Sequence, residues 1–253
     1  MTLRLLSSLA LLALTACAAR TPASPAPDPI AEAAVTELAV LGMIHDGHTT
    51  SERYSLDVVR RIIRQLDPEV VLTEIPPDRL DTALAEFADH GAVSEPRVAR
   101  FPEYVDALIP LQDELGFVIE PCAAWTRPMA DARRARLDAL RAEQPARMAE
   151  VDAAWERVEP QLAALGPKDD PAVIHTDAYD TLVARGMTPY AALDLGAGGW
   201  TAINEAHFAL VADALDRHRG RRVLLMFGAG HKGWFLQRLR ARADVRLVHP
   251  ITD

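Results

Sequence analysis

The chain has 253 residues, of which 49% are hydrophobic and 25% charged, a composition typical of a globular protein rather than a disordered or fibrous one. Its 27 Lys and Arg against 36 Asp and Glu give a net charge of -9, and the basic residues form no long cluster, which excludes nucleic acid as a partner. Two cysteines cannot form a disulfide framework or a cysteine-rich zinc scaffold.

The first residues have the pattern of a bacterial lipoprotein signal peptide. A ten-residue apolar stretch, Leu5 to Leu14, follows Arg4 and is too short to span a bilayer. Residues 14–17, Leu-Thr-Ala-Cys, look like a lipobox, in which cleavage leaves Cys17 first and its thiol carries acyl chains such as palmitate. We therefore predict a signal peptide over residues 1–16 and a membrane anchor at Cys17. An ordinary signal peptide with an incidental cysteine is the alternative.

Residues 17–35 are predicted to tether the folded part to the membrane. They are rich in Ala and Pro, a composition typical of an extended linker. Ala18, directly after the cysteine, resembles lipoproteins sorted to the outer membrane. We expect the folded part to face the periplasm from that membrane.

The folded part begins with a strand, helix, strand unit. Residues 36–43 form a short apolar run ending near a glycine, which predicts a buried strand. Residues 56–66 have apolar side chains at helical spacing with arginines on the other face, and residues 69–73 form a second apolar run. The crossover should be right-handed and the two strands parallel.

The rest of the chain continues the alternation of strands and helices, except for one wholly helical stretch. We predict helices over 102–115, 201–219 and 231–242, strands over 117–120, 223–227 and 245–248, and a helical insertion over about 126–165, divided near Pro145. Residues 166–199 have no readable pattern. Residues 36–253 are thus predicted to form a single α/β domain with a mostly parallel sheet of about five strands and helices on both faces.

Side chains capable of chemistry follow four of the predicted strands. His45 follows the first strand, Glu74 and Glu120 end the next two, and His231 follows the fourth. The carboxyl ends of parallel strands share one edge of a sheet, and ligands bind at that edge. The sequence therefore predicts a site there.

Several of these residues also have structural interpretations. His48 is close enough to His45 to share one metal ion, although it can equally belong to a solvated turn. Arg79, five residues after Glu74, is an obvious partner for a buried carboxylate. His207 lies on the apolar side of its helix, as core histidines do, and Cys122 is expected to be a buried, unreactive thiol.

Residues 228–233 match the spacing G-x-G-x-x-G between a strand and a helix. Only twenty residues follow, and the last predicted strand ends without the acidic residue that a nucleotide ribose requires. We therefore set nucleotide binding aside. A helix N-terminus that can face an anion remains.

Two Gly-x-x-His motifs, Gly42 to His45 and Gly228 to His231, each close a strand, and Glu74 ends the strand between them in the sequence. This arrangement resembles the TraB, GumN and Tiki group, within the superfamily that also holds erythromycin esterases and ChaN-like haem-binding lipoproteins. The resemblance covers roughly residues 36–80 and 200–250.

The resemblance implies a membrane-tethered, metal-dependent hydrolase, most similar to peptidases. His45, Glu74 and His231, together with His48, would hold or serve a divalent metal ion, and Arg79 would orient the glutamate or bind an anionic group. The substrate would be a peptide or a small molecule. The sequence departs from the pattern at residues 204–205, Asn-Glu, where relatives commonly have a basic residue, and this puts anion recognition there in doubt.

Three other functions remain open at this point. ChaN-like proteins bind haem iron through side chains, and His48 and Tyr54 could supply such ligands here. Erythromycin esterases imply a histidine general base that works without a metal. An inactive envelope scaffold is the last alternative.

Overall fold

The computed structural model describes residues 35–251. The predictions for the signal peptide, for Cys17 and for the tether up to residue 34 lie outside this range. Within the range, no helix combines the length and the apolar character needed to cross a bilayer.

The centre of the fold is a parallel sheet of five strands in the order β3-β2-β4-β1-β5. The strands are β1 (Thr36–Met43), β2 (Val70–Thr73), β3 (Val118–Pro121), β4 (Arg222–Gly228) and β5 (Val245–Val248). The predicted α/β class is confirmed, and the sheet is wholly parallel. Met43 pairs with Gly228 and Thr73 with Met226, so β1, β4 and β2 end at nearly the same level.

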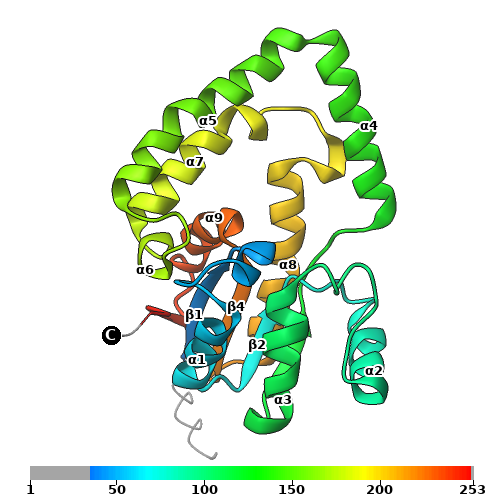
Figure 1. The fold of residues 1–253 in the computed structure, drawn as a ribbon, viewed down its shortest axis with the longest axis vertical. Helices are drawn as coiled ribbons and strands as arrows, with labels where there is room; N and C mark the ends of the chain where they lie inside the picture. Colours follow the sequence, from blue (N-terminus) through cyan, green and yellow to red (C-terminus); the bar gives the residue numbers. More distant parts are fainter. Residues whose placement is uncertain (1–34, 252–253) are drawn as a thin grey trace, which may run out of the picture. The chain divides into compact units, whose positions relative to one another are not determined.

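Side chains that alternate along each strand fill two cores, one on each face of the sheet. Ala39, Leu41 and Met43 of β1 pack against α1 (Leu56–Leu66) and the helical stretch 103–115. Leu38 and Val40 point to the other face, where α8 (Trp200–Arg217) and α9 (Ala229–Leu239) cover the sheet (Figure 1). This period-two alternation explains why the strands read as continuous apolar runs.

The helical segment, residues 127–191, comprises α4 (Arg127–Glu143), α5 (Pro145–Leu165), α6 (Pro171–Ile174) and α7 (Asp177–Ala191). Pro145 opens α5, as predicted, whereas Pro160 lies inside α5 without ending it. Helices continue well beyond the predicted limit near residue 165. Figure 1 shows α5 and α7 side by side, and they pack so closely that a Cβ on Gly186 would lie 3.0 Å from the Trp155 ring.

Two other departures from the predicted elements affect the candidate site. The helix predicted over 102–115 begins as a π-helix, η2 (Glu103–Leu108), before α3 (Ile109–Leu115), and π-helical turns are frequent at functional sites. Helix α9 starts two residues earlier than predicted, which places His231 in its first turn. A helix absent from the prediction, α2 (Leu80–His90), follows β2.

Candidate functional site

Three of the predicted residues come together at the carboxyl edge of the sheet. His45 Nε2 lies 4.0 Å from Glu74 Oε2, and His231 Nε2 lies 3.9 Å from Glu74 Oε1. They follow β1, β2 and β4, which are neighbours in the sheet, and the level strand ends bring them into one place. We call these three side chains the strand-end site.

In each of the two histidines, a hydrogen-bond acceptor binds Nδ1, the ring nitrogen that does not face Glu74. His45 Nδ1 donates to Glu103 Oε1 at 2.6 Å, and His231 Nδ1 donates to Asn204 Oδ1 at 2.7 Å. The Asn204 amide cannot be flipped, because its Nδ2 donates to the carbonyl of Trp200 at 2.7 Å. With the proton on Nδ1, each neutral ring presents the lone pair of Nε2 to Glu74.

Hydrogen bonds with a backbone amide and with a tyrosine hydroxyl hold Glu74 in place, and the residue is 7% exposed. The amide of Gly228 donates to Glu74 Oε2 at 2.9 Å, and the amide of Glu74 donates to the Tyr104 hydroxyl at 2.9 Å. That hydroxyl donates in turn to the carbonyl of Met226 at 2.7 Å. The π-helix η2 thus supplies both Tyr104 and Glu103, so it holds two of the three side chains in place.

Glycine keeps the space between these side chains open. A Cβ at Gly228 would lie 2.6 Å from His45 Nε2 and 3.5 Å from Glu74 Oε2. His45 itself has a φ of 51°, a left-handed conformation that costs a non-glycine residue roughly 1 kcal/mol or more. The backbone is therefore arranged around the His45 ring at some cost in energy.

The two histidines differ in basicity. Burial lowers the pKa of His45, but the hydrogen bond and charge of Glu103 and the charge of Glu74 outweigh it, so the pKa is raised above 6.5. Burial, with a smaller contribution from His45, lowers the pKa of His231 to about 4. His231 is therefore neutral at neutral pH, and its Nε2 can act as a ligand.

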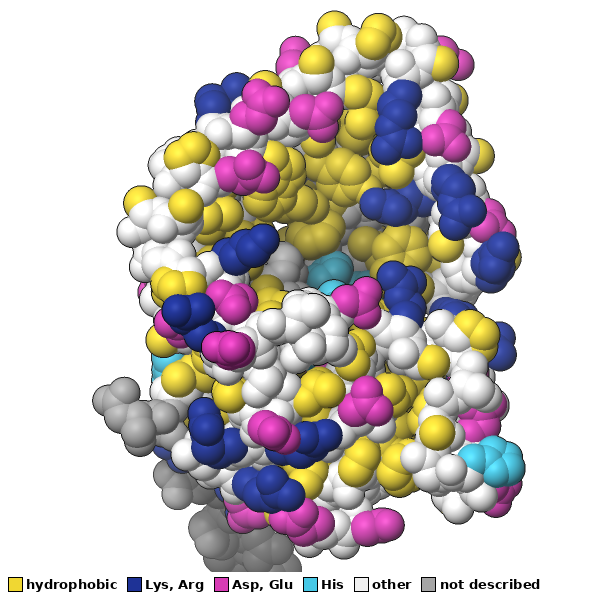
Figure 2. Space-filling model, in the orientation of Figure 1, with side chains coloured by type: hydrophobic (Ala, Val, Ile, Leu, Met, Phe, Trp, Pro, Cys, Tyr) yellow, Lys and Arg dark blue, Asp and Glu magenta, His cyan; other side chains and the backbone are white. Residues whose placement is uncertain are grey.

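The strand-end site opens into a cavity of about 1120 Å³ beneath the helical segment. Figure 2 shows the hollow, with histidine at its base, apolar side chains above and basic side chains along one side. Its walls include aromatic residues, namely Trp125, Trp155, Tyr190 and Trp200. Trp200 also stacks on His231, with ring centroids 4.8 Å apart.

Arg79 lines this cavity but does not hold Glu74, as the sequence had suggested. Its Nε lies 3.1 Å from Asp78 and 3.8 Å from Glu95. Arg79 is the N-cap residue of α2, the helix that the prediction missed, and α2 starts by turning the chain away from the end of β2. The assignment of Arg79 as the partner of Glu74 is therefore wrong.

His48 and Tyr54 are likewise built into the protein interior. His48 Nε2 accepts from the amide of Ile44 at 3.1 Å, and its Nδ1 donates to the carbonyl of Tyr54 at 2.6 Å. The Tyr54 hydroxyl donates to the carbonyl of Gly42 at 3.0 Å, and Tyr54 is fully buried. With these atoms engaged, neither residue is available as a metal or haem ligand in this structure.

The other candidates, Glu120, Cys122 and His207, are not part of the strand-end site. Glu120, on the edge strand β3, pairs with His218 at 2.6 Å and with Arg217 at 2.7 Å. Burial raises the pKa of Cys122 to about 12. His207 is buried beside His231 and accepts from the amide of Ala124 at 2.8 Å, as expected of a core histidine.

Sequence analysis missed Glu103 and Asn204, the two residues that orient the histidines. Glu103 lies in a stretch interpreted only as an amphipathic helix, and nothing in its neighbourhood marks it as buried. Asn204 was noted, but as a departure from a basic residue. Its spacing to His207, on the same helix face, is the signal that could have placed it against the sheet.

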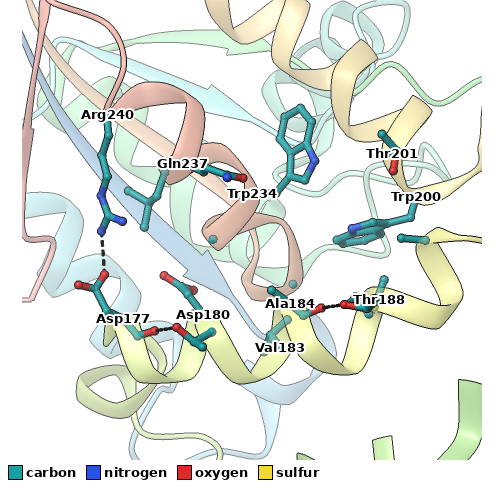
Figure 3. Close-up of a pocket in the computed structure, with 16 residues that line it drawn as sticks. Asp177, Asp180, Val183, Ala184, Thr188, Trp200, Thr201, Trp234, Gln237 and Arg240 are labelled. Carbon is teal, nitrogen blue, oxygen red and sulfur yellow. Dashed lines mark hydrogen bonds and ion pairs between the residues drawn. The ribbon is translucent and has the colours of Figure 1, made fainter. Parts of the chain in front are cut away.

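A second cavity of about 730 Å³ lies between α7 and α9 (Figure 3). Trp200 lines both cavities. In the close-up, Arg240, the C-cap residue of α9, donates to Asp177 of α7 at 2.7 Å, and Trp200 and Trp234 line the same cavity. This second cavity contains none of the strand-end site residues.

The distances between the donor atoms of the strand-end site are slightly longer than those between ligands of one metal ion. Over residues 35–251, no three His, Cys, Asp or Glu side chains are already positioned as a metal-binding group. Two ligands about 2.1 Å from one ion at the tetrahedral angle are about 3.4 Å apart, so the pairs at 3.9 and 4.0 Å need a closure of about half an ångström.

Comparison with known proteins yields no matching family model, no matching curated protein and no matching solved structure.

Proposed function

We propose that the chain is a hydrolase of the TraB and Tiki type that uses a divalent metal ion, acts on peptides, and is anchored in the bacterial envelope through Cys17. One observation carries the proposal. With both rings protonated on Nδ1, three acceptor groups converge, namely the Nε2 atoms of His45 and His231 and the Glu74 carboxylate, and no donor lies between either Nε2 atom and the carboxylate oxygen that it faces. Such an arrangement is repulsive unless a proton or a cation lies between the groups.

Charge favours a cation there. Glu74 and Glu103 are both buried, at 7% and 0% exposure, and Glu103 Oε2 has no hydrogen-bond partner among residues 35–251. Two buried carboxylates cost several kcal/mol unless positive charge offsets them. Held by His45, Glu74 and His231, a divalent ion would offset these charges and would supply a water molecule activated for attack at neutral pH.

The protein's own groups would act as supports. Glu103 and Asn204 hold the Nδ1 protons, which fixes the tautomer and turns both Nε2 atoms inward. The Gly228 amide holds one oxygen of Glu74. The cavity leaves room beside the strand-end site that a peptide would occupy.

A second candidate, a hydrolase without a metal, is favoured by the His45–Glu103 pair. At 2.6 Å, with the pKa of His45 raised, the pair has the geometry of a general base oriented by a carboxylate. In that case Glu74 would stabilise the protonated ring.

Metal titration of the full-length chain, purified in detergent without chelators, tests the proposal. We expect one Co²⁺ or Zn²⁺ per chain by calorimetry and visible absorption, and loss of binding in His45→Ala and His231→Ala. His90→Ala, which changes an exposed histidine at the end of α2, is the matched control. Wild-type stoichiometry in either site variant would overturn the metal site. Hydrolysis that survives EDTA but not His45→Ala would favour the second candidate.

A further inference from the structure

Arginine dominates the charged lining of the large cavity, although the chain as a whole is acidic, with a net charge of -9. Arg127, Arg134 and Arg141 recur every seven residues along α4 and therefore share one face of that helix. Glu74, Glu95 and Asp131 are the acidic residues that line the same space. The arginine side chains of the lining are Arg79, Arg97, Arg100, Arg127, Arg133, Arg134 and Arg141.

Four of these arginines have acidic partners. Arg79 and Arg97 lie against Asp78, at 3.1 and 3.3 Å. Arg127 pairs with Asp131 at 2.8 Å. Arg141 pairs with Asp138 at 2.9 Å. These pairs neutralise much of the lining and belong to the structure of the wall.

Three arginines, Arg100, Arg133 and Arg134, have no acidic partner within the described part of the chain. Three uncompensated cations on the wall of one cavity repel one another, and the repulsion is weakened only by solvent and salt. A bound anion would relieve it.

Neighbouring residues hold the Arg133 side chain in place without a bound ligand. Its Nε donates to the Tyr190 hydroxyl at 2.9 Å, and its guanidinium lies over the rings of Tyr190 and Trp125, 5.7 and 5.9 Å from their centroids. A Cβ on Gly198 would come within 2.8 Å of the Arg133 side chain, so the glycine makes room for it. Such an ordered guanidinium loses little entropy when it binds a carboxylate.

Arg100 brings positive charge close to the strand-end site. Its guanidinium lies 5.2 Å from the centroid of the Phe101 ring, and that ring lies 5.0 Å from the centroid of the His45 ring. Arg100 and Arg134 are both exposed, and Arg134 lies on α4. The unpaired charge therefore extends from the candidate reaction centre to the helical segment.

We propose that the cavity recognises peptides that carry carboxylates, through Arg100, Arg133 and Arg134, while their apolar side chains contact the aromatic wall. The cleavage of such peptides rests on the proposed function above, but their binding does not. The carboxylate can come from an acidic side chain or from the C-terminus of the peptide. The guanidinium groups supply charged N–H donors in both cases, and in Arg133 these come from Nη1 and the outer hydrogen of Nη2, because Nε and Nη2 donate to the Tyr190 hydroxyl.

Binding is measured on the full-length chain by energy transfer from tryptophan to dansyl pentapeptides. The first probe is dansyl-Gly-Leu-Glu-Leu-Gly amide, the second has Gln in place of Glu, and the third is the Gln peptide with a free C-terminal carboxylate. The variants are Arg133→Gln with Arg134→Gln, Arg100→Gln, and His45→Ala with His231→Ala. Arg136→Gln is the matched control, because Arg136 lies on α4 outside the cavity lining.

We expect at least one acidic peptide to bind about tenfold more tightly than the neutral one, and the arginine variants to lose that preference. Arg136→Gln should keep it. The stronger of the two acidic probes identifies the carboxylate that is recognised. Equal binding of all three peptides, or an unchanged preference in both arginine variants, would overturn the inference.

The histidine double variant separates the two proposals. It should bind no metal but keep the preference for acidic peptides, because the arginines are intact. If the wild-type chain takes up no metal but still prefers the acidic peptides, the proposed metal site is refuted and the proposed recognition of carboxylates is not. Arg133→Lys keeps the positive charge but not the planar guanidinium group. It checks that the loss of acidic-peptide preference in the Gln variants reflects lost recognition of the carboxylate and not a folding defect.

Discussion

The strand-end site and the helical segment are built in opposite ways. His45, Glu74 and His231 each lie within three residues of the end of a strand, and the three strands are neighbours in the sheet. The helical segment, residues 127–191, forms part of the cavity wall with helices that pack on one another and have a small core of their own. Under the proposed function, residues that need exact geometry are thus placed on the sheet, and residues that would contact the substrate are placed outside it.

Two buried polar contacts join the regions. Lys232, next to His231, donates to both oxygens of Asp180 on α7 at 2.6 Å. The amide of Gly42, at the end of β1, donates to Nε2 of His175, just after α6, at 2.9 Å. If the regions are separable in function, changes at these contacts and changes inside the site should have different consequences.

The largest effect is expected from Lys232→Met, which leaves Asp180 without its cation. Lys232 is 2% exposed, and losing one partner of a buried pair typically costs about 3–5 kcal/mol. Urea unfolding should show this loss. Adding Asp180→Leu removes the unpaired charge and should restore much of the stability. If the single variant is as stable as wild type, the contact does not hold α7 to α9.

The strand-end site was predictable because its chemistry follows from strand positions. Apolar runs end at residues 43, 73 and 228, and in a parallel sheet those ends meet, so His45, Glu74 and His231 follow without knowledge of any helix. Glu103 was not predictable in the same way. It lies in the π-helical turn of η2 and not at the end of a strand, so the sheet pattern does not place it.

Proximity in sequence misled the assignments of His48 and Arg79. His48 lies three residues from His45, but η1 (His45–Thr49) turns it into the core, where backbone groups use both of its nitrogens. Arg79 faces Asp78 and Glu95, since a proline pair and α2 redirect the chain after Glu74. The extension of the helical segment to residue 191 went unseen because Pro189 and Gly186 lie inside α7, where they reduce helix propensity.

Gly228→Ala sharpens the comparison by changing the site alone. The added methyl group would lie 2.6 Å from His45 Nε2, so the ring must move out of the space shared with Glu74. We expect metal affinity to fall by about a hundredfold or more, which corresponds to about 2.7 kcal/mol. The part of the acidic-peptide preference that Arg133 and Arg134 supply should persist, because these two arginines lie on α4 and not beside His45.

Gly230→Ala is the matched control, since a Cβ there meets only Trp200, at an ordinary 3.8 Å. It lies in α9, and replacing a helical glycine by alanine should be neutral or mildly stabilising. Calorimetry with Zn²⁺ compares the two variants. Equal metal affinity in both would show that the space beside Gly228 is not where the ion binds.

The smallest effect is a dependence on pH at the second contact between the regions. Burial, with the charges of Lys232 and His249 adding to it and the hydrogen bond to Pro171 opposing it, lowers the pKa of His175 to about 3. An unfolded histidine titrates near 6.5, so between pH 6.5 and 3 the unfolded state binds more protons. This residue's contribution to stability is complete above pH 6.5 and decreases as the pH falls, by about 2 kcal/mol at pH 5.

His175→Gln isolates that contribution. Its side-chain oxygen can accept from the Gly42 amide and its NH₂ can donate to the Pro171 carbonyl, as the two ring nitrogens do, but it does not titrate. The free energy of unfolding is measured in urea at pH 8 and at pH 5. Its decrease between these two pH values should be about 2 kcal/mol smaller for this variant than for wild type. His48, His207 and His231, whose pKa values burial also lowers, titrate in both proteins and cancel in the difference. A variant as sensitive to acid as wild type would mean that His175 is not held neutral, and that the contact between α6 and β1 is weaker than its geometry implies.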